Sequence, residues 1–414
     1  MRINTNVSAI VSNNALQKAQ DALSSSIQRL SSGYKINRAA DDAAGLSISE
    51  KMRKQIRGLD QASTNAEDGV SAVQTAEGAL TEVHSMLQRM NELAVQASNG
   101  PNSKTDRDAI QSEIDQLTTE IDRVAETTKF NESYLLKGDA DGATKDVYMN
   151  GHDAGLKGTL TDGATTATFK VAAGALDSGK KVTIGGKEYT IGSKEADVKD
   201  LIKAPGTGKP KNKVTIDGTD YEIDNGGKIY KAGSATALTK KDLGGTAAGD
   251  ADLNDFKALV KAGAKVSIDG KDYAIMKDEN TDNVDDADSS IISATKAVEL
   301  MTTELTTANN IGATKTAATI AAGTYASDTG IEFTITKGTA EVAEKLNFNL
   351  HVGSDADMTN KINVNIETMS SSYLGIKGLN VSDDTGVAAT YAVDAIADAL
   401  QKVSDQRSSL GAVQ

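Results

Sequence analysis

The chain has 414 residues, which is enough for two or three domains with cores of their own, and it contains no Cys. Disulfides, thiolate metal ligands and Cys nucleophiles are therefore excluded. The formal net charge of −14 argues against nucleic-acid binding. No apolar run approaches the ~20 residues that cross a bilayer, and the N-terminus lacks the apolar core of a secretory signal peptide. Export would need another route.

The N-terminal region, to about residue 135, has a helical pattern and little Gly. Its first part repeats Leu every seven residues, at Leu16, Leu23 and Leu30. Gly33 and the run NRAADD (37–42) then interrupt this rhythm. The pattern predicts a helix, a break and a second helix.

The second helix is expected from about Asp42 to Ser98, because an unbroken heptad pattern begins at Leu59. Its first seam position holds Leu59, Ala66, Val73, Leu80, Leu87 and Ala94, and its second holds Ala62, Gly69, Ala76, Val83, Met90 and Ala97. A helix of this length cannot bury its own apolar stripe, so it needs partner helices.

Gly100 and Pro101 end this helix, and Thr105 with Asp108 resembles a capping box for the next one. The next helix is expected to fold back antiparallel along the long one, with an apolar stripe of Ile110, Ile114, Leu117, Ile121 and Val124. A last helix is expected from about Ala388, with Val393, Ile396, Leu400, Val403 and Leu410 on one stripe. It stops at Gln414 without a cap, so we expect a helix that is cut short.

Between the helical ends lies a region rich in Gly, Thr, Asp and Lys that contains an internal repeat. The three copies are KVTIGGKEYTI (181–191), KVTIDGTDYEI (213–223) and KVSIDGKDYAI (265–275). Alternating residues around Gly-Gly or Asp-Gly predict a hairpin with a tight turn in each copy. Short helical pieces are expected at 195–204 and 252–264, which makes the region a set of small α+β units.

Motifs for catalysis and metal binding are missing from the sequence. His occurs only at His84, His152 and His351, without the zinc-protease spacing, and there is no phosphate-binding loop or nucleophile elbow. We interpret His84 as a helix-surface residue. The acidic run 278–290 lacks the Gly and Glu of a calcium loop, and we interpret it as a solvated loop. We expect no enzyme, cofactor or metal, unless the middle hides a site without a known motif.

Both ends of the chain resemble bacterial flagellin. The resemblance rests on residues 1–80, MRINTNVSAIVSNNALQKAQDALSSSIQRLSSGYKINRAADDAAGLSISEKMRKQIRGLDQASTNAEDGVSAVQTAEGAL. It also rests on LQRMNELAVQASNG (87–100), DRDAIQSEIDQLTTEIDRVAETTKFN (106–131), INVNIETMSSSYLGI (362–376) and DALQKVSDQRSSLGAVQ (398–414). It covers about residues 1–137 and 360–414. Flagellins continue beyond the segment that ends here at Gln414, so the resemblance implies that the C-terminal end of the usual chain is lacking and that polymerisation is impaired.

The resemblance implies the fold class and the domains. The fold is an α-helical antiparallel rod or bundle, coiled-coil-like, formed by the N- and C-terminal regions, with an inserted α+β hairpin-rich variable region. The expected domains are an inner-tube helix with its spoke (1–45), the rod with its return helix (46–137), the surface-exposed variable region (138–359) and the C-terminal part of the rod (360–414). Within the first, the helix spans about residues 3–33 and the spoke Gly33 to Gly45. A soluble coiled-coil protein with an inserted domain predicts the same periodicity, but not these spoke residues.

The resemblance also implies a receptor site, since many flagellins are bound by a Toll-like receptor of the innate immune system. The matching residues are Gln88, Arg89, Leu93, Gln96, Ile110 and Glu113. Arg89, Leu93 and Gln96 lie at i, i+4 and i+7, so we expect them on one outward face. Alternatively, Leu93 packs on a neighbouring helix. Ile110 fits the apolar stripe of its own helix.

The leading functional interpretation is the structural subunit of a flagellar filament. It would self-assemble with other flagellin subunits outside the cell, after export without a cleaved signal peptide. The resemblance allows an export chaperone as a further partner, and no nucleic acid or membrane span is expected. The alternative is an adhesin or receptor-binding module carried by the middle region.

Overall fold

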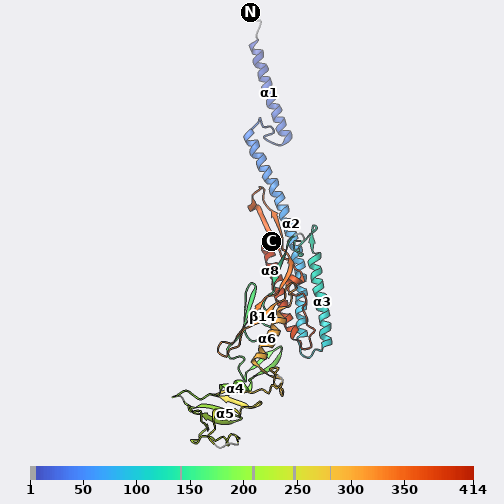
Figure 1. Cartoon of the computed structure of the whole chain (residues 1–414). Coiled ribbons are helices and arrows are strands. Elements are labelled where there is room, and N and C mark those ends of the chain that lie inside the picture. The colour runs from blue at the N-terminus through green and yellow to red at the C-terminus, as the bar shows by residue number, and fades with distance from the viewer. Residues whose placement is uncertain (1–5, 140–141, 208–209, 246–248, 280) are drawn as a thin grey trace. The chain divides into compact units, whose positions relative to one another are not determined.

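The computed structural model describes residues 6–139, 142–207, 210–245, 249–279 and 281–414, and Figure 1 colours them in chain order. They form two compact units. The first holds the described residues up to Gln74 with Asn347–Asn365 and the last two residues, and the second holds Thr75–Leu346 and Ile366–Ala412. The four expected domains remain a prediction.

Helix α1, Val7–Ser32, is bounded by two capping residues. The side chain of Asn6 accepts a hydrogen bond from the backbone N–H of Ala9 at 3.2 Å. Gly33 ends the helix in the left-handed region, at φ 75°, a conformation that favours Gly. The predicted break at Gly33 is confirmed. Residues 3–5 of the expected helix lie outside the described residues.

Helix α2, Ala43–Ala97, matches the predicted long helix to within one residue at each end. Asp42 caps its start by accepting a hydrogen bond from the N–H of Gly45 at 2.9 Å. Both seam positions are buried from Val73 to Ala97, as the heptad pattern predicts. The predicted seam is not buried at its N-terminal end, where Leu59 is 54% exposed because no described residue of its own unit covers it.

Helix α3, Lys104–Thr127, returns beside the C-terminal part of α2 (Figure 1). Its capping box is formed by Ser103 and Asp106 and not, as predicted, by Thr105 and Asp108. Both pairs have the same spacing, but the chain leaves the Pro101 turn early enough for Ser103 to take the extended cap conformation. The short pair β1 (Lys129–Phe130) and β2 (Ser133–Tyr134) follows α3.

The C-terminal helix α8, Val387–Val413, begins one residue before the predicted start. Its buried face includes four Ala, together with Ile396, Val403 and Leu410 as predicted. The buried residues are Ala389, Tyr391, Ala392, Ala395, Ile396, Ala399, Val403, Gln406 and Leu410. Val393 and Leu400 of the predicted stripe are only half-buried. Small side chains let neighbouring backbones approach closely.

The strand-rich region of the second unit contains three larger sheets and a two-stranded pair. The first sheet has the order β14-β15-β5-β4: Thr319–Ala322, Ile331–Thr336, Thr166–Val171 and Thr159–Asp162. The second has the order β13-β7-β6: Ile291–Ser293, Lys187–Gly192 and Lys181–Ile184. The third has the order β10-β9-β8-β11-β12: Ile229–Lys231, Thr219–Ile223, Asn212–Ile216, Lys265–Ile268 and Lys271–Ala274. The pair is β16 (Thr339–Ala343) with β3 (Thr144–Tyr148).

All three sequence repeats form the predicted hairpins: β6–β7, β8–β9 and β11–β12. Their turns require positive φ at both central residues, for example 48° at Asp217 and 79° at Gly218. The prediction of separate small units is wrong for two copies, because β8 pairs with β11 and joins the second and third hairpins into one sheet. The first hairpin lies in another sheet, beside the parallel strand β13.

Short helices cover these sheets. They are α4 (Glu195–Leu201), α5 (Leu253–Lys257) and α6 (Ala294–Asn309), and α4 and α5 are shorter than predicted. One core packs α6 with Phe169 and Phe333, whose rings lie 6.1 Å apart. The other packs α4 and α5 on the five-stranded sheet, where Tyr221 and Phe256 meet edge to face at 5.0 Å.

The remaining elements come from the last quarter of the chain. They are the paired strands β17 (Leu346–His351) and β18 (Lys361–Ile366), the 3-10 turn η1 (Met358–Asn360) and the one-turn helix α7 (Ser371–Leu374). Asp122 of α3 holds the start of α7, since its carboxylate accepts hydrogen bonds from the N–H of Ser371 at 2.7 Å and from its hydroxyl at 2.8 Å. Among the described residues, no helix has the length and apolar character of a membrane span.

Candidate functional site

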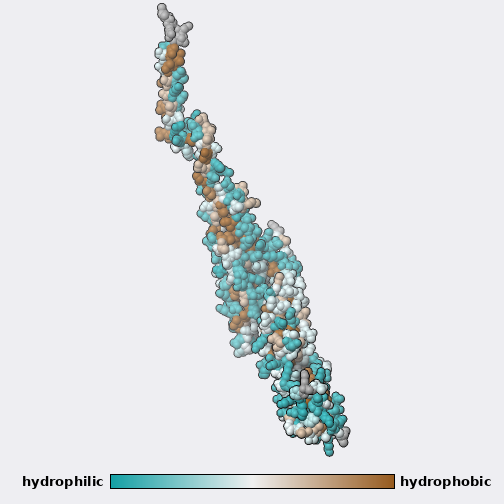
Figure 2. Space-filling view, turned by 90° about the vertical axis from the view of Figure 1, so that its left-hand side faces the viewer, coloured by the Kyte–Doolittle hydropathy of each residue, from teal (hydrophilic) through white to brown (hydrophobic). Residues whose placement is uncertain are grey.

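Helix α1 has no buried residue although it carries many apolar side chains. The exposed ones are Val7, Ile10, Val11, Leu16, Leu23, Ile27 and Leu30, each more than half exposed. Figure 2 shows brown, apolar patches on the side of this helix that faces the viewer. An isolated helix of this length gains little stability without tertiary packing, so its apolar surface indicates a missing partner.

The apolar residues of α1 lie on two faces. Leu16, Leu23, Ile27 and Leu30 are spaced seven, four and three residues apart and share one face. Val7, Ile10 and Val11 share a second face near the start of the helix. Nine residues separate Val7 from Leu16, which at 100° per residue places the two faces on opposite sides. Full burial of α1 therefore requires neighbours on both sides.

The first part of α2 continues the exposed apolar surface. Ile48, Met52, Ile56 and Leu59 are spaced four, four and three residues apart and are all more than half exposed. Beside them, the guanidinium of Arg53 lies 5.5 Å from the centre of the Tyr34 ring. This cation–π contact fixes the segment after α1 against α2.

Four of the six receptor residues implied by the resemblance lie at the surface. Gln88, Arg89 and Gln96 are exposed on α2, and Glu113 is half-buried on α3. Arg89 Nε and Glu113 Oε1 form an ion pair at 2.9 Å, which also raises the pKa of Arg89. The structure thus brings residues of two helices together on one surface.

The other two residues are buried. Ile110 is 7% exposed, as its place in the stripe of α3 suggests. The expectation that Leu93 points outward is wrong, because its side chain is only 2% exposed. The physical reason is the position of α3. Its Glu113 pairs with Arg89, which lies one turn before Leu93 on the same side of α2, so α3 runs along that side. A helix with more than one neighbour buries a wider stripe than a two-helix seam.

Sequence reasoning missed Arg107, a fully buried cation that joins three segments. It donates to the backbone oxygens of Ala97 at 2.8 Å, Asn99 at 3.3 Å and Asp384 at 3.0 Å. Two of these oxygens lie at the end of α2, where a cation is favoured by the helix dipole. An Arg four residues after the N-cap Ser103 carries no sequence signal for this role.

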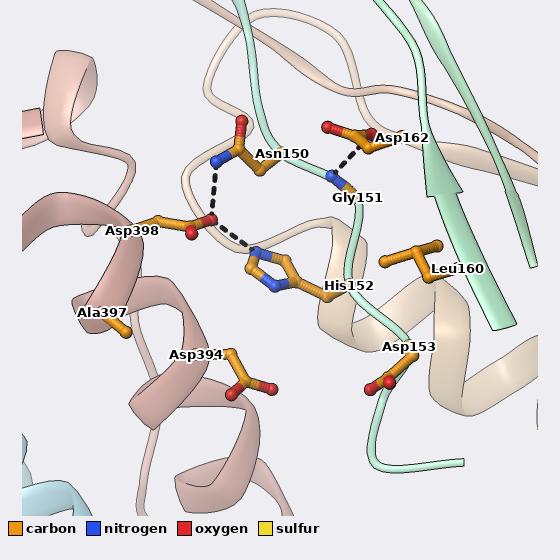
Figure 3. Close-up of a pocket in the computed structure, with 9 residues that line it drawn as sticks. All are labelled: Asn150, Gly151, His152, Asp153, Leu160, Asp162, Asp394, Ala397 and Asp398. Atoms are coloured by element: carbon orange, nitrogen blue, oxygen red, sulfur yellow. Dashed lines mark hydrogen bonds and ion pairs between the residues drawn. The ribbon is translucent and has the colours of Figure 1, made fainter. Parts of the chain in front are cut away.

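A hollow of about 420 Å³ lies beside α8 in the second unit (Figure 3). The residues that line it include four carboxylates and one imidazole: Asn150, Gly151, His152, Asp153, Leu160, Asp162, Asp394, Ala397 and Asp398. Asp398 Oδ2 accepts a hydrogen bond from Asn150 Nδ2 at 2.9 Å and lies 3.6 Å from His152 Nε2 (Figure 3). These contacts tie the 150–153 loop to α8.

The residues that line the hollow carry carboxylates and an imidazole, and none of them carries a hydroxyl or thiol. Burial raises the pKa of Asp394, helped by the charges of Asp153 and Asp398 and opposed by that of His152.

The described residues of the acidic run 278–290 form a largely exposed loop, as predicted, except at Asp285. Asp285 is 7% exposed and accepts hydrogen bonds from the backbone N–H of Lys277, Ala287 and Asp288. It organises the turn because a buried carboxylate must be satisfied by donors. Within the described ranges, no three acidic or His side chains are grouped as metal ligands.

Comparison with known proteins identifies the family. A model described as the bacterial flagellin N-terminal helical region matches residues 3–141. A flagellin of Clostridium tyrobutyricum is 56% identical over 159 residues, and the match covers 36% of this chain but only 41% of that relative. A flagellin of Serratia marcescens is 38% identical over 282 residues, and the match covers 66% of this chain and 73% of that relative.

A solved structure, FliC from Burkholderia pseudomallei, is 20% identical and covers 84% of this chain and 98% of its own, with a TM-score of 0.26 that is too low to support a conclusion. The Serratia match extends over nearly three quarters of that protein, beyond the N-terminal helices. With its long N-terminal helical region and its mixed, strand-rich middle, the chain belongs to the flagellin family.

Proposed function

We propose that this protein is the structural subunit of the bacterial flagellar filament and forms it by self-assembly outside the cell. The observation that carries the proposal is the exposed apolar surface of α1, which lies on two opposite faces. Burial of both faces requires neighbours on two sides, as packing among identical subunits provides. Membership of the flagellin family indicates that this assembly is the flagellar filament.

In this proposal the four expected domains have separate tasks. Residues 1–45 would form the inner tube and spoke, and residues 46–137 with 360–414 would form an antiparallel, coiled-coil-like bundle. Residues 138–359 would face the solvent. Export would proceed without a cleaved signal peptide, with a chaperone as an additional partner. The protein would have no enzymatic activity, since flagellins act as structural proteins.

We further propose that an innate immune Toll-like receptor binds the surface formed by Gln88, Arg89, Gln96 and Glu113. The ion pair between Arg89 and Glu113 supports this proposal, because it holds both side chains in place before binding. Leu93 and Ile110 are buried and would contribute only indirectly, by fixing the positions of α2 and α3.

Filaments sheared from the cells that produce this protein would test the main proposal. Mass spectrometry should identify this chain as the bulk component, and electron microscopy should show helically symmetric filaments that antibodies against residues 138–359 decorate along their length. If the chain were only a trace component, or confined to one end of the filament, the proposal would be wrong.

A further inference from the structure

A second hollow in the strand-rich region has a different character from the acidic one beside α8. Its volume is about 460 Å³, within the range of small-molecule sites. It lies where the end of β5, the turn after it, the start of β6 and helix α6 meet. The residues that line it are Lys157, Val171, Ala173, Gly174, Ala175, Asp177, Lys180, Lys181, Val182, Thr183 and Met301.

Three ammonium groups belong to this hollow, although the chain as a whole carries a net charge of −14. Lys181 pairs with Glu188 at 2.6 Å. Within the described part of the chain, Lys157 and Lys180 have no ion-pair partner. Both side chains are exposed, so they can move onto a bound anion without losing an existing contact.

The single carboxylate that lines the hollow, Asp177, is already paired with groups that do not line it. Asp177 Oδ2 pairs with Lys271 at 2.6 Å and accepts a hydrogen bond from the hydroxyl of Ser327 at 2.8 Å. Its Oδ1 accepts a hydrogen bond from Tyr325 at 2.9 Å. Asp177 is thus engaged with groups outside the hollow and repels a bound anion only weakly.

The rest of the lining is apolar or small. Ala173 is exposed and Ala175 and Val182 are half-buried, so their methyl groups are open to a ligand, whereas Val171 and Met301 are almost fully buried. The segment 173–175 forms a wall with methyl groups and one Gly. Such a surface gains free energy by covering the C–H face of a ring, which a bare inorganic anion cannot supply.

We propose that this hollow binds a carboxylated sugar, with the carboxylate on Lys157 and Lys180 and the apolar face of the ring on Ala173, Ala175 and Val182. The charges select an anion, and the apolar floor selects an anion that carries a hydrocarbon surface. Free sugar acids and the acidic ends of glycans share this chemistry.

The test is isothermal titration calorimetry on the full chain with N-acetylneuraminic acid, 3′-sialyllactose, neutral N-acetylglucosamine and sodium sulfate. Both acidic sugars should bind, and more weakly as salt is added. Binding of the free acid alone would support the site and assign it to free sugar acids. Equal binding of neutral N-acetylglucosamine would overturn the proposal, because it would show that the ligand needs no negative charge. Equal binding of sulfate would overturn it too, because it would show that the ligand needs no apolar surface.

Two variants locate the binding. Lys157→Gln/Lys180→Gln should weaken affinity by about tenfold or more. The matched control Lys170→Gln/Lys187→Gln removes the same charge from exposed lysines outside the lining and should bind like the wild type. Ala173→Leu fills the hollow from an exposed position and should also abolish binding. Equal loss in both double variants, or full binding in Ala173→Leu, would contradict the proposed site.

Discussion

The guanidinium of Arg107 on α3 donates a hydrogen bond to the backbone oxygen of Ala97, the last residue of α2, at 2.8 Å. A side chain from the return helix thereby caps the end of the long one. The same guanidinium reaches Asp384, just before α8, at 3.0 Å. One buried cation therefore fixes three segments of the helical region.

Arg107→Leu should destabilise the second unit strongly, by about 3 kcal/mol or more, because it leaves three backbone oxygens without their donor. Urea denaturation followed by circular dichroism measures the change. Arg123→Leu, on the same helix, is the control. It removes only an exposed pair with Glu120 and should denature like the wild type. Equal effects of the two changes would refute the capping role.

Leu93→Ala should lower stability by about 2–5 kcal/mol, as Leu87→Ala should, because both side chains are buried. Arg89→Ala and Gln96→Ala should leave the melting temperature nearly unchanged. Arg89→Ala should weaken receptor binding about tenfold if its surface is the contact. Calorimetry and receptor affinity would be measured on all four variants. Normal melting of Leu93→Ala would show that Leu93 is not part of the core.

The pH dependence of stability should contain a contribution from Asp394, whose folded-state pKa is raised by burial. The folded state then holds the proton more tightly than the unfolded state, so this contribution is full below about pH 4 and is lost as the pH rises through the raised pKa. Asp394→Asn should therefore be more stable than the wild type at pH 7 and equal to it at low pH. Thermal melts at several pH values measure this.

Asp21→Asn, at an exposed position of α1, is the control for Asp394→Asn and should not change the pH profile. A lower stability of Asp394→Asn at pH 7 would mean that the carboxylate is stabilised by His152 more than it is destabilised by burial.

Two glycines should respond to Ala in opposite directions. Gly218→Ala should destabilise the five-stranded sheet by about 1–2 kcal/mol, because its φ of 79° is unfavourable for residues with a Cβ. Gly78 lies inside α2 with open space around an added Cβ, so Gly78→Ala should stabilise by about 0.5–1 kcal/mol. The denaturation midpoints of both variants measure these changes. An unchanged midpoint for Gly218→Ala would argue against the tight turn.

The elements best predicted from the sequence were those with a local cause. The Asp-Gly turns of the hairpins and the heptads of α2 determine structure within a few residues, and Gly33 ends α1 by its own conformation. The capping box was misplaced because two equally spaced candidates follow each other, and the sequence alone does not show where the chain leaves the preceding turn.

The features that were missed depend on residues far apart in the chain. Burial of Leu93 depends on α3, and the role of Arg107 depends on an oxygen 277 positions away. Asp394 and His152 meet only when α8 packs against the 150–153 loop. Neither the periodicity of apolar residues nor the spacing of motifs in the sequence predicts such long-range contacts.

The central claim, assembly through the apolar faces of α1, is tested most directly by counting filaments on cells that carry only this flagellin. Leu16→Asp/Leu23→Asp places charges on one apolar face, while Gln17→Asp/Ser24→Asp places the same charges with the same spacing on a polar face of the helix. Electron microscopy should show no filaments for the first variant, although the protein is still made, and normal filaments for the second. Normal filaments from Leu16→Asp/Leu23→Asp would contradict the claim.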